Sequence, residues 1–280
     1  MTVANDRTYV ADSVVPSSKP APAVSPGTLS HAGGWALVAA LLLIWEVSAR
    51  SGLVNSQSWP AFSQVLSATA LTLYSGELTG VLASTAMRML AGFAIGGGLG
   101  VVLGLLVGTI PILHRLLSPL FEAVRPLPIP AIVPPLILFL GIGDELKIFV
   151  VSLAVMFPVL VNTTGGIRSI DGVLMQTAKT FRKGAAYTLL FVTLPAALPA
   201  ILAGLRISLS LALVTTIVAE MIAGSGGVGY YLIVTQYGMQ PDKMYAAVLC
   251  LAALGYALNR GFTFLEDRLI AWDRRGDVSA

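Results

Sequence analysis

Long apolar runs, separated by short polar segments, dominate the chain after residue 33. A helix needs roughly 20 apolar residues to cross a bilayer, and six runs approach or exceed that length. These runs are residues 34–52, 89–110, 118–143, 147–166, 199–224 and 244–265. Residues 63–87 are half-polar, and we expect them to form a helix outside the membrane that leads into the second run. The pattern predicts an all-α membrane protein with six transmembrane helices.

The first 33 residues differ from the rest, because Pro, Ser, Ala and Gly dominate them without apolar periodicity. Such a composition is typical of a disordered tail. It does not predict a secretory signal, since the first apolar run follows it. We therefore divide the chain into a tail (1–33), a first span with the segment after it (34–80), a core that holds the other five spans (81–266) and a C-terminal tail (267–280).

The composition agrees with a lipid environment. Charged residues make up 11% of the chain and the mean hydropathy is +0.83, whereas a soluble domain carries about 25% charged residues. The net charge of +3 is too small to indicate a nucleic-acid partner. The single cysteine, Cys250, excludes a disulfide within the chain, and no Cys or His spacing typical of a metal site is present.

Enzyme motifs are absent from the sequence as well. HExxH, GxSxG and GxxxxGK[ST] do not occur. His31 and His114 lie outside the predicted spans, and solvated histidines are the simplest interpretation of both. We therefore expect no catalytic, metal or nucleotide site in this chain, so that any energy for work must come from a partner.

The distribution of Lys and Arg predicts the orientation. With both ends in the cytoplasm, the inside segments hold Arg7, Lys19, Arg115, Arg168, Lys179, Arg182, Lys183, Arg268, Arg274 and Arg275. The outside segments then hold only Lys147 and Lys243, with Arg50 and Arg88 near span edges. We therefore expect a multi-pass protein with cytoplasmic termini, in which residues 167–195 form the longest cytoplasmic loop between spans.

Within this loop, residues 176–195 read QTAKTFRKGAAYTLLFVTLP. The pattern predicts a short helix over 176–181, a break at Gly184, a second helical segment over 185–192 and a new element that starts at Leu194 and Pro195. A short helix with an apolar side chain, Phe181, beside two cations suits a docking element for another protein. An ordinary basic loop on the cytoplasmic side is the alternative.

The third apolar run contains five prolines within residues 125–135. Each proline inside a helix removes a backbone hydrogen bond, and a helix in contact with lipid does not tolerate such losses. We therefore expect this run to face the interior of the bundle and to line a pathway. A kinked packing helix is the alternative.

Charged residues interrupt the third and the fifth apolar runs, and intramembrane charges usually face a cavity or one another. Glu122 and Arg125 are three residues apart, close enough to pair on one helical face. Arg125 and Arg206 lie near the predicted cytoplasmic ends of their spans, where extension to the interface is the alternative. The candidate pathway residues are Glu122, Arg125, Pro126, Pro128, Pro130, Arg206 and Glu220.

Residues 125–171, RPLPIPAIVPPLILFLGIGDELKIFVVSLAVMFPVLVNTTGGIRSID, and 194–230, LPAALPAILAGLRISLSLALVTTIVAEMIAGSGGVGY, carry a resemblance. They resemble the membrane permeases of bacterial ABC importers, in the group for nitrate, sulfonate, taurine and bicarbonate. The resemblance covers residues 53–268. It implies the type I ABC importer permease fold, a homodimer in the inner membrane, two copies of an ATP-binding subunit that uses ATP and Mg, and a periplasmic binding protein.

The resemblance also implies that the 176–195 segment docks on the ATP-binding subunit. Members of this family carry Glu-Ala-Ala, three residues, Gly, and about a dozen more residues to Leu-Pro. Here Gln176 and Thr177 replace Glu and the first Ala, and Arg182 replaces the Gly, whereas Ala178 matches. The predicted coupling residues are Gln176, Thr177, Ala178, Phe181, Arg182, Lys183, Gly184, Leu194 and Pro195.

The solute is less well specified than the family. Substrates of this group are often small anions, for which Arg125 and Arg206 would give the pathway a positive lining. One alternative is the same architecture for an uncharged or cationic solute that resembles a vitamin precursor. A second is a channel that needs no ATPase, and a third is a membrane enzyme or scaffold, for which no catalytic pattern is present.

Overall fold

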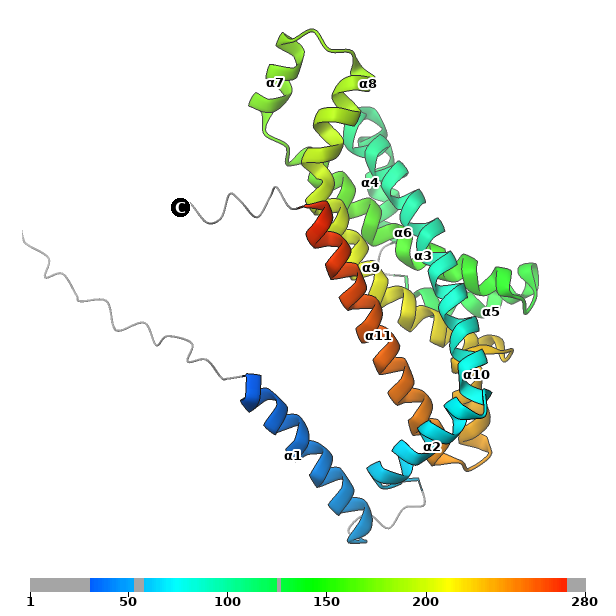
Figure 1. Ribbon diagram of the computed structural model, residues 1–280. Coiled ribbons are helices and arrows are strands. Elements are labelled where there is room, and N and C mark those ends of the chain that lie inside the picture. The colour runs from blue at the N-terminus through cyan, green and yellow to red at the C-terminus, as the bar shows by residue number, and fades with distance from the viewer. Residues whose placement is uncertain (1–30, 53–57, 125–126, 271–280) are drawn as a thin grey trace, which may run out of the picture. The chain divides into compact units, whose positions relative to one another are not determined.

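The computed structural model describes residues 31–52, 58–124 and 127–270, which form helices joined by short connections (Figure 1). The elements are α1 (His31–Arg50), α2 (Phe62–Tyr74), α3 (Glu77–Thr109), α4 (Pro111–Val124), α5 (Ile129–Leu140), α6 (Asp144–Arg168), α7 (Gly172–Thr180), α8 (Ala185–Thr188), a π-helical turn η1 (Leu189–Thr193), α9 (Leu194–Ala223), α10 (Gly227–Tyr237) and α11 (Pro241–Leu269). The predicted all-α class is confirmed. Most of the two predicted tails lies outside the described residues.

The chain divides into two compact units, Met1–Trp45 and Glu46–Ala280. The first contains most of α1, and the second contains the helices from α2 to α11. Among the residues that the structure describes, four helical segments are long and apolar enough to cross a membrane, namely α3, α6, the stretch Ala185–Ala223 and α11. The number rises to five if α4 and α5 form one bent span. The predicted total of six spans stays a prediction.

The third predicted span is not one continuous helix. α4 ends at Val124 and α5 begins at Ile129, and the two axes differ by 95°. Pro128 takes an extended conformation (φ −70°, ψ 102°) and caps α5, while Pro130 lies in the first turn of α5. A proline fixes its own φ and lacks an N–H, so it starts a helix more readily than it continues one. The prolines thus interrupt the helix within 118–143, and the prediction that α4 and α5 together form one broken span stays a prediction.

The second predicted span, 89–110, lies within a longer helix. The half-polar segment 63–87, predicted to be a helix that leads into this span, is divided at Gly76, and α3 continues from Glu77 to Thr109. Gly76 has φ +80°, a left-handed conformation that glycine adopts at little cost. This one glycine ends α2 and allows the chain to turn into α3.

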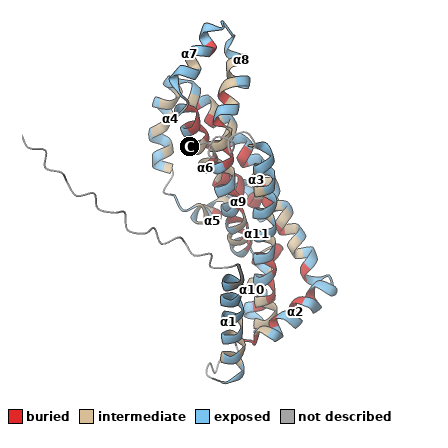
Figure 2. Cartoon of the chain, turned by 60° about the vertical axis from the view of Figure 1, so that its left-hand side comes forward, coloured by how far each residue is buried: buried red, intermediate tan, exposed pale blue. Residues whose placement is uncertain are grey.

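The core of the second unit is built from α3, α6 and α9. Its central cluster consists of Met89, Val151, Val155, Val159, Leu209 and Ala212. Small residues bring α3 close to α6, as the glycine-rich sequence of the second run predicted. Figure 2 shows buried residues along α6 and α9, whereas α7 and α8 at one end of this bundle are mostly exposed. We call this end the α7 end and the opposite one the α10 end.

Candidate functional site

The segment that links α6 to α9 projects from the α7 end of the bundle (Figure 1). α7 begins at an Asp171 cap, whose carboxylate accepts a hydrogen bond of 2.8 Å from the Val173 N–H. Within the predicted coupling residues of α7, Ala178 is buried, whereas Gln176 and Thr177 are exposed. The short helix expected over 176–181 is thus present, and it starts four residues earlier at Gly172.

The break after α7 is at Arg182 and not at Gly184. Arg182 has φ +51°, a left-handed conformation that L-residues with side chains rarely adopt. Its N–H donates to the Lys179 carbonyl (2.9 Å), which closes the end of α7. Gly184 has an ordinary φ of −63° and caps α8. The left-handed turn therefore lies at the position where the family resemblance places a glycine, although this chain has an arginine there.

We expect Arg182→Gly to stabilise this segment. The left-handed conformation costs a residue with a side chain about 1 kcal/mol, and glycine avoids that cost. For a chain of this size the melting temperature should rise by about 2–4 °C per kcal/mol, provided that the loop unfolds with the bundle. Thermal unfolding of the purified protein in detergent measures the change.

Lys183→Gly is the matched control for this prediction. Lys183 is an adjacent exposed cation without a positive φ, so glycine there relieves no backbone strain. It adds flexibility to the unfolded chain and removes the contact of Lys183 with Tyr187. We expect its melting temperature to fall slightly or to stay constant. If the melting temperature fell equally for Arg182→Gly and Lys183→Gly, the left-handed turn would not be strained.

The surface of this segment combines an apolar side chain with cations. Phe181 is 70% exposed. Lys183 Nζ lies 4.9 Å from the ring centre of Tyr187, which in turn lies 4.7 Å from Phe191. No acidic residue occurs between Gly172 and Ala219. Leu194 is half-buried against the core, and Pro195 is exposed in the first turn of α9. An exposed aromatic side chain directly after a short helix is suited to insertion into a partner protein.

A buried polar cluster lies at the α10 end. Glu220, in the last turn of α9, has no exposed surface. Its carboxylate accepts hydrogen bonds from Thr85 Oγ1 (2.9 Å), Arg88 Nη1 (2.9 Å) and the Gly229 N–H (3.0 Å). Arg88 Nε donates to Asp144 at 2.8 Å. The Glu220 carboxylate therefore joins α9 to α3 and α10, and Arg88 extends the cluster to Asp144 of α6. A role for Glu220 in the pathway stays a prediction.

The glycine-rich connection from α9 to α10 is held by the same cluster. Thr85 Oγ1 accepts a hydrogen bond from the Val228 N–H (2.8 Å). Lys147 is 1% exposed, and its ammonium group contacts the carbonyl and the hydroxyl of Ser225. Gly227 has φ +88°, and a Cβ there would lie 2.1 Å from the Glu220 carboxyl carbon. This connection is thus ordered by side chains that are distant in sequence.

The sequence did not predict that Thr85, Arg88 and Lys147 belong to this cluster. Lys147 is buried in the first turn of α6, and its predicted place on the outer side of the membrane stays a prediction. One signal was available for Arg88, because an arginine directly before a long apolar run needs a partner at membrane depth. The partner itself, 132 residues away, was not visible in the spacing.

A further contact at the α10 end involves Glu77 at the start of α3. Its carboxylate accepts hydrogen bonds from Tyr231 Oη (3.1 Å) and Lys243 Nζ (3.2 Å). Burial, helped by the hydrogen bond to Glu77, raises the pKa of Tyr231 well above its ordinary value. Tyr231 therefore stays a neutral donor at physiological pH.

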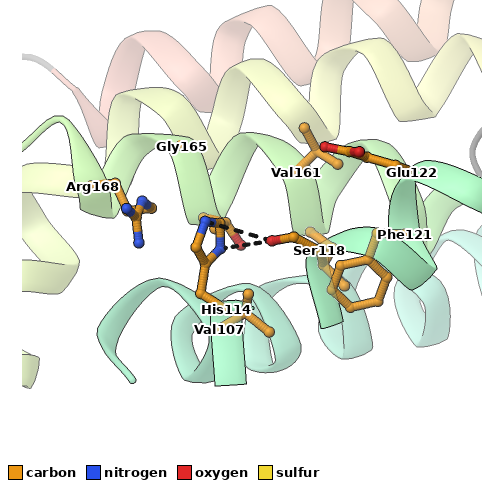
Figure 3. Close-up of a pocket in the computed structure, with 10 residues that line it drawn as sticks. Val107, His114, Ser118, Phe121, Glu122, Val161, Gly165 and Arg168 are labelled. Carbon is orange, nitrogen blue, oxygen red and sulfur yellow. Dashed lines mark hydrogen bonds between the residues drawn. The ribbon is translucent and has the colours of Figure 1, made fainter. Parts of the chain in front are cut away.

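A pocket of about 250 Å³ lies between α4 and α6, toward the α7 end. His114, Ser118 and Glu122 of α4 line it together with Arg168 of α6 (Figure 3). The Ser118 hydroxyl is 3.1 Å from His114 Nδ1. The pocket contains one predicted pathway residue, Glu122. No pathway role was predicted for the other three, although the spacing of 114, 118 and 122 places them on one helical face. The interpretation of His114 as a solvated histidine is wrong, because it is half-buried in α4 beside Ser118.

The other pathway candidates lie elsewhere. Arg125 and Pro126 lie outside the described residues, so the expected pair of Glu122 with Arg125 stays a prediction. Arg206 of α9 does not line the pocket, because it contacts Glu266 of α11 at 3.4 Å and Thr263 at 3.4 Å. The structure therefore does not bring Arg206 and Glu122 to one site.

Comparisons with known proteins agree on one family. The family described as "Binding-protein-dependent transport system inner membrane component" matches residues 98–271. The aliphatic sulfonates transport permease protein SsuC of Escherichia coli is 34% identical over 85% of this chain and 91% of its own length. SsuC of Bacillus subtilis is 32% identical over 85% of this chain and 87% of its own length. The taurine transport system permease protein TauC of E. coli is 30% identical over 84% of this chain and 87% of its own length.

A solved structure has a similar fold. The inward-facing MetNI methionine ABC transporter superimposes with a TM-score of 0.56 over 65% of this chain and 93% of that chain. The sequence identity is 19%, so the likeness concerns the fold alone.

Proposed function

Since this chain belongs to the family of binding-protein-dependent transport system inner membrane components, we propose that it moves a small sulfonate or related organic anion across the bacterial inner membrane. The chain is a multi-pass transport subunit. Its curated relatives of 30–34% identity include two sulfonate permeases and one taurine permease, which supports this solute class.

The energy for transport comes from a separate ATP-binding subunit that binds ATP and Mg. The observation that carries this proposal is the α7–α8 segment, which projects from the bundle with Phe181 70% exposed. Two copies of the chain form the pathway, and each presents this segment to one ATP-binding subunit in the cytoplasm. Closure of the ATP-binding subunits draws the segments together and opens the pathway to the outside, which is a rigid-body change between two states.

A periplasmic binding protein delivers the solute to the α10 end in this scheme. Both termini of the chain then lie in the cytoplasm, α1 supplies one further span, and the homodimer has twofold symmetry. The proline-rich turn at Pro128 and Pro130 faces the interior, because irregular backbone at membrane depth needs protein or water around it. Glu122, Arg125, Pro126, Arg206 and Glu220 remain the candidate residues of the pathway.

Two alternatives make different predictions. If the chain is a permease of the same architecture for an uncharged or cationic solute, the periplasmic binding protein should prefer such a ligand. A channel without an ATPase would conduct when the chain is reconstituted alone, whereas an importer subunit should stay closed.

Copurification tests the proposal. The chain carries a C-terminal tag and is isolated in mild detergent from its native host after crosslinking through Lys183→Cys. We expect an ATP-binding subunit at near-equal stoichiometry, joined to residue 183. Lys243→Cys, at the α10 end, is the matched control and should not crosslink to that subunit. A preparation without any ATP-binding subunit would contradict the proposed coupling.

A further inference from the structure

The pocket between α4 and α6 has opposite charges at its two ends (Figure 3). Arg168 and His114 lie at one end, Glu122 lies at the other, and Ser118 lies between them. These charged and polar side chains follow one another along the length of the pocket. The buried side chains of Val107 and Leu160 form an apolar part of its wall.

Within the part of the chain that the structure describes, neither charge in the pocket has a partner of opposite sign; Arg125, the partner expected for Glu122 from the sequence, lies outside that part. Among the described residues, no ion pair or hydrogen bond involves the Glu122 carboxylate or the Arg168 guanidinium. Elsewhere in the bundle Arg88, Arg206 and Lys243 each contact a carboxylate at 3.4 Å or less. Two opposite charges that line one cavity without contact leave room for a ligand that carries both signs.

The surroundings exclude lipid chains as the occupant. α4 and α5 together are apolar enough for a span, and Glu122 is exposed on α4. A bare carboxylate against acyl chains is costly, so this face requires water, protein or a polar ligand. Phe121 packs edge-on against Phe157 of α6 at 6.4 Å, which holds α4 in place beside the pocket.

The spacing on α4 limits the size of the ligand. Ser118 and Glu122 are one helical turn apart, about 5.4 Å along the axis. The pair of His114 and Ser118 is preformed by their contact of 3.1 Å. A ligand that contacts both residues therefore places an acceptor group at Ser118 and a donor group at Glu122, and a short spacer joins the two groups.

We propose that this pocket binds a small zwitterion, with its oxyanion group against Arg168, His114 and Ser118 and its ammonium group against Glu122. The inference rests on the proposed transport function, and it narrows the solute from an anion to a compound that also carries an ammonium group. A simple anion brings a second negative charge into the pocket beside the Glu122 carboxylate, and this like-charge repulsion discriminates against it. The headgroup of phosphatidylethanolamine shares this chemistry.

Binding to the full-length chain in nanodiscs of phosphatidylglycerol tests the inference by isothermal titration calorimetry. The probes are taurine, which carries both groups, ethanesulfonate, which lacks the ammonium, and ethanolamine, which lacks the sulfonate. We expect taurine to bind about tenfold more tightly than either single-charge probe. Glu122→Gln should abolish the preference over ethanesulfonate, and Arg168→Gln should abolish the preference over ethanolamine.

Two variants serve as matched controls. Arg115→Gln removes a neighbouring exposed cation on α4 that does not line the pocket, and Glu145→Gln removes an exposed carboxylate at the start of α6. Both should keep the preference for taurine. Equal binding of the three probes, no taurine binding at 10 mM, or a preference that survives Glu122→Gln would overturn the inference.

The source of the zwitterion is a separate arm of the test. The affinity for taurine is measured again after phosphatidylethanolamine is added to the nanodiscs. An unchanged affinity identifies a dissolved solute as the ligand, whereas a weaker affinity identifies the lipid headgroup as a competing occupant. The titration needs no ATP-binding subunit. If taurine shows no preferential binding but an ATP-binding subunit copurifies, the zwitterion site is refuted and the proposed transport function stands. If taurine binds as expected but no ATP-binding subunit copurifies, the proposed transport function is refuted.

Discussion

Replacement of Glu220 by alanine is expected to lower the free energy of unfolding by about 3–5 kcal/mol, the usual cost of removing one partner of a buried ion pair. Glu220 and Thr85 are fully buried, and the Arg88 side chain is 12% exposed. Without the carboxylate, the Arg88 guanidinium loses its buried contact, and the Gly229 N–H loses its acceptor. Unpaired buried donors are more costly than the original pair was favourable.

Glu220→Gln should cost less than Glu220→Ala. The amide oxygen still accepts hydrogen bonds from the backbone and from Thr85, whereas the charge that balances Arg88 is lost. Chemical denaturation of the purified protein in detergent, followed by intrinsic fluorescence, measures both changes on one scale.

Glu77→Ala is the matched control at the same end of the bundle. Glu77 pairs with Lys243 at 3.2 Å, but both side chains are more than a third exposed (42% and 34%). Exposed pairs contribute about 0–1 kcal/mol. Equal destabilisation by Glu77→Ala and Glu220→Ala would show that the Glu220 cluster is not a buried determinant of stability.

Replacement of Gly96 by alanine is expected to separate α3 from α6. Glycines at every fourth position of α3, namely Gly92, Gly96, Gly100 and Gly104, face α6 directly. A Cβ on Gly96 would lie 2.2 Å from the Ser152 carbonyl oxygen, which is a backbone atom and cannot rotate away. Overpacking in a dense core costs about 1–3 kcal/mol, and we expect at least the upper part of this range because two long helices must shift.

Gly98→Ala is the control for this prediction. It lies on the same helix two residues away, and a Cβ there meets nothing within 4 Å. Alanine favours a helix over glycine by about 0.5–1 kcal/mol, so this variant should be neutral or slightly more stable. Size-exclusion chromatography compares the yield of folded protein for Gly96→Ala and Gly98→Ala, and thermal unfolding compares their melting temperatures. A similar loss of folded protein for both would argue against close packing at Gly96.

The sequence by itself determined the class of this protein. The long apolar runs predicted an all-α membrane protein, because only helices satisfy their own backbone hydrogen bonds in lipid. The glycines of the second run predicted close helix packing, and α3 does approach α6 at these positions. The residues at 125–171 and 194–230 identified the permease family, which the comparisons confirm. Each of these properties depends on composition or on spacing along one stretch of chain.

Local spacing also predicted the short helix α7, but not the conformation of the residues after it. Gly184 was the expected break because glycine tolerates unusual backbone angles. The structure places the left-handed turn at Arg182, two residues earlier. The hydrogen bond from the Arg182 N–H to Lys179 ends the helix there, and propensity alone does not reveal which residue takes that position.

Only the tertiary structure decided which charges meet. Glu220 contacts Arg88 and Thr85, which are 132 and 135 residues away, and Arg206 contacts Glu266 across 60 residues. Lys147 is buried against the α9–α10 connection, a contact that its position in the sequence did not predict. Arg168 and Glu122 belong to different helices and share one pocket. A charge in an apolar run requires a polar environment, but the fold alone selects the helix that supplies it, because partners from distant segments leave no periodic trace in the sequence.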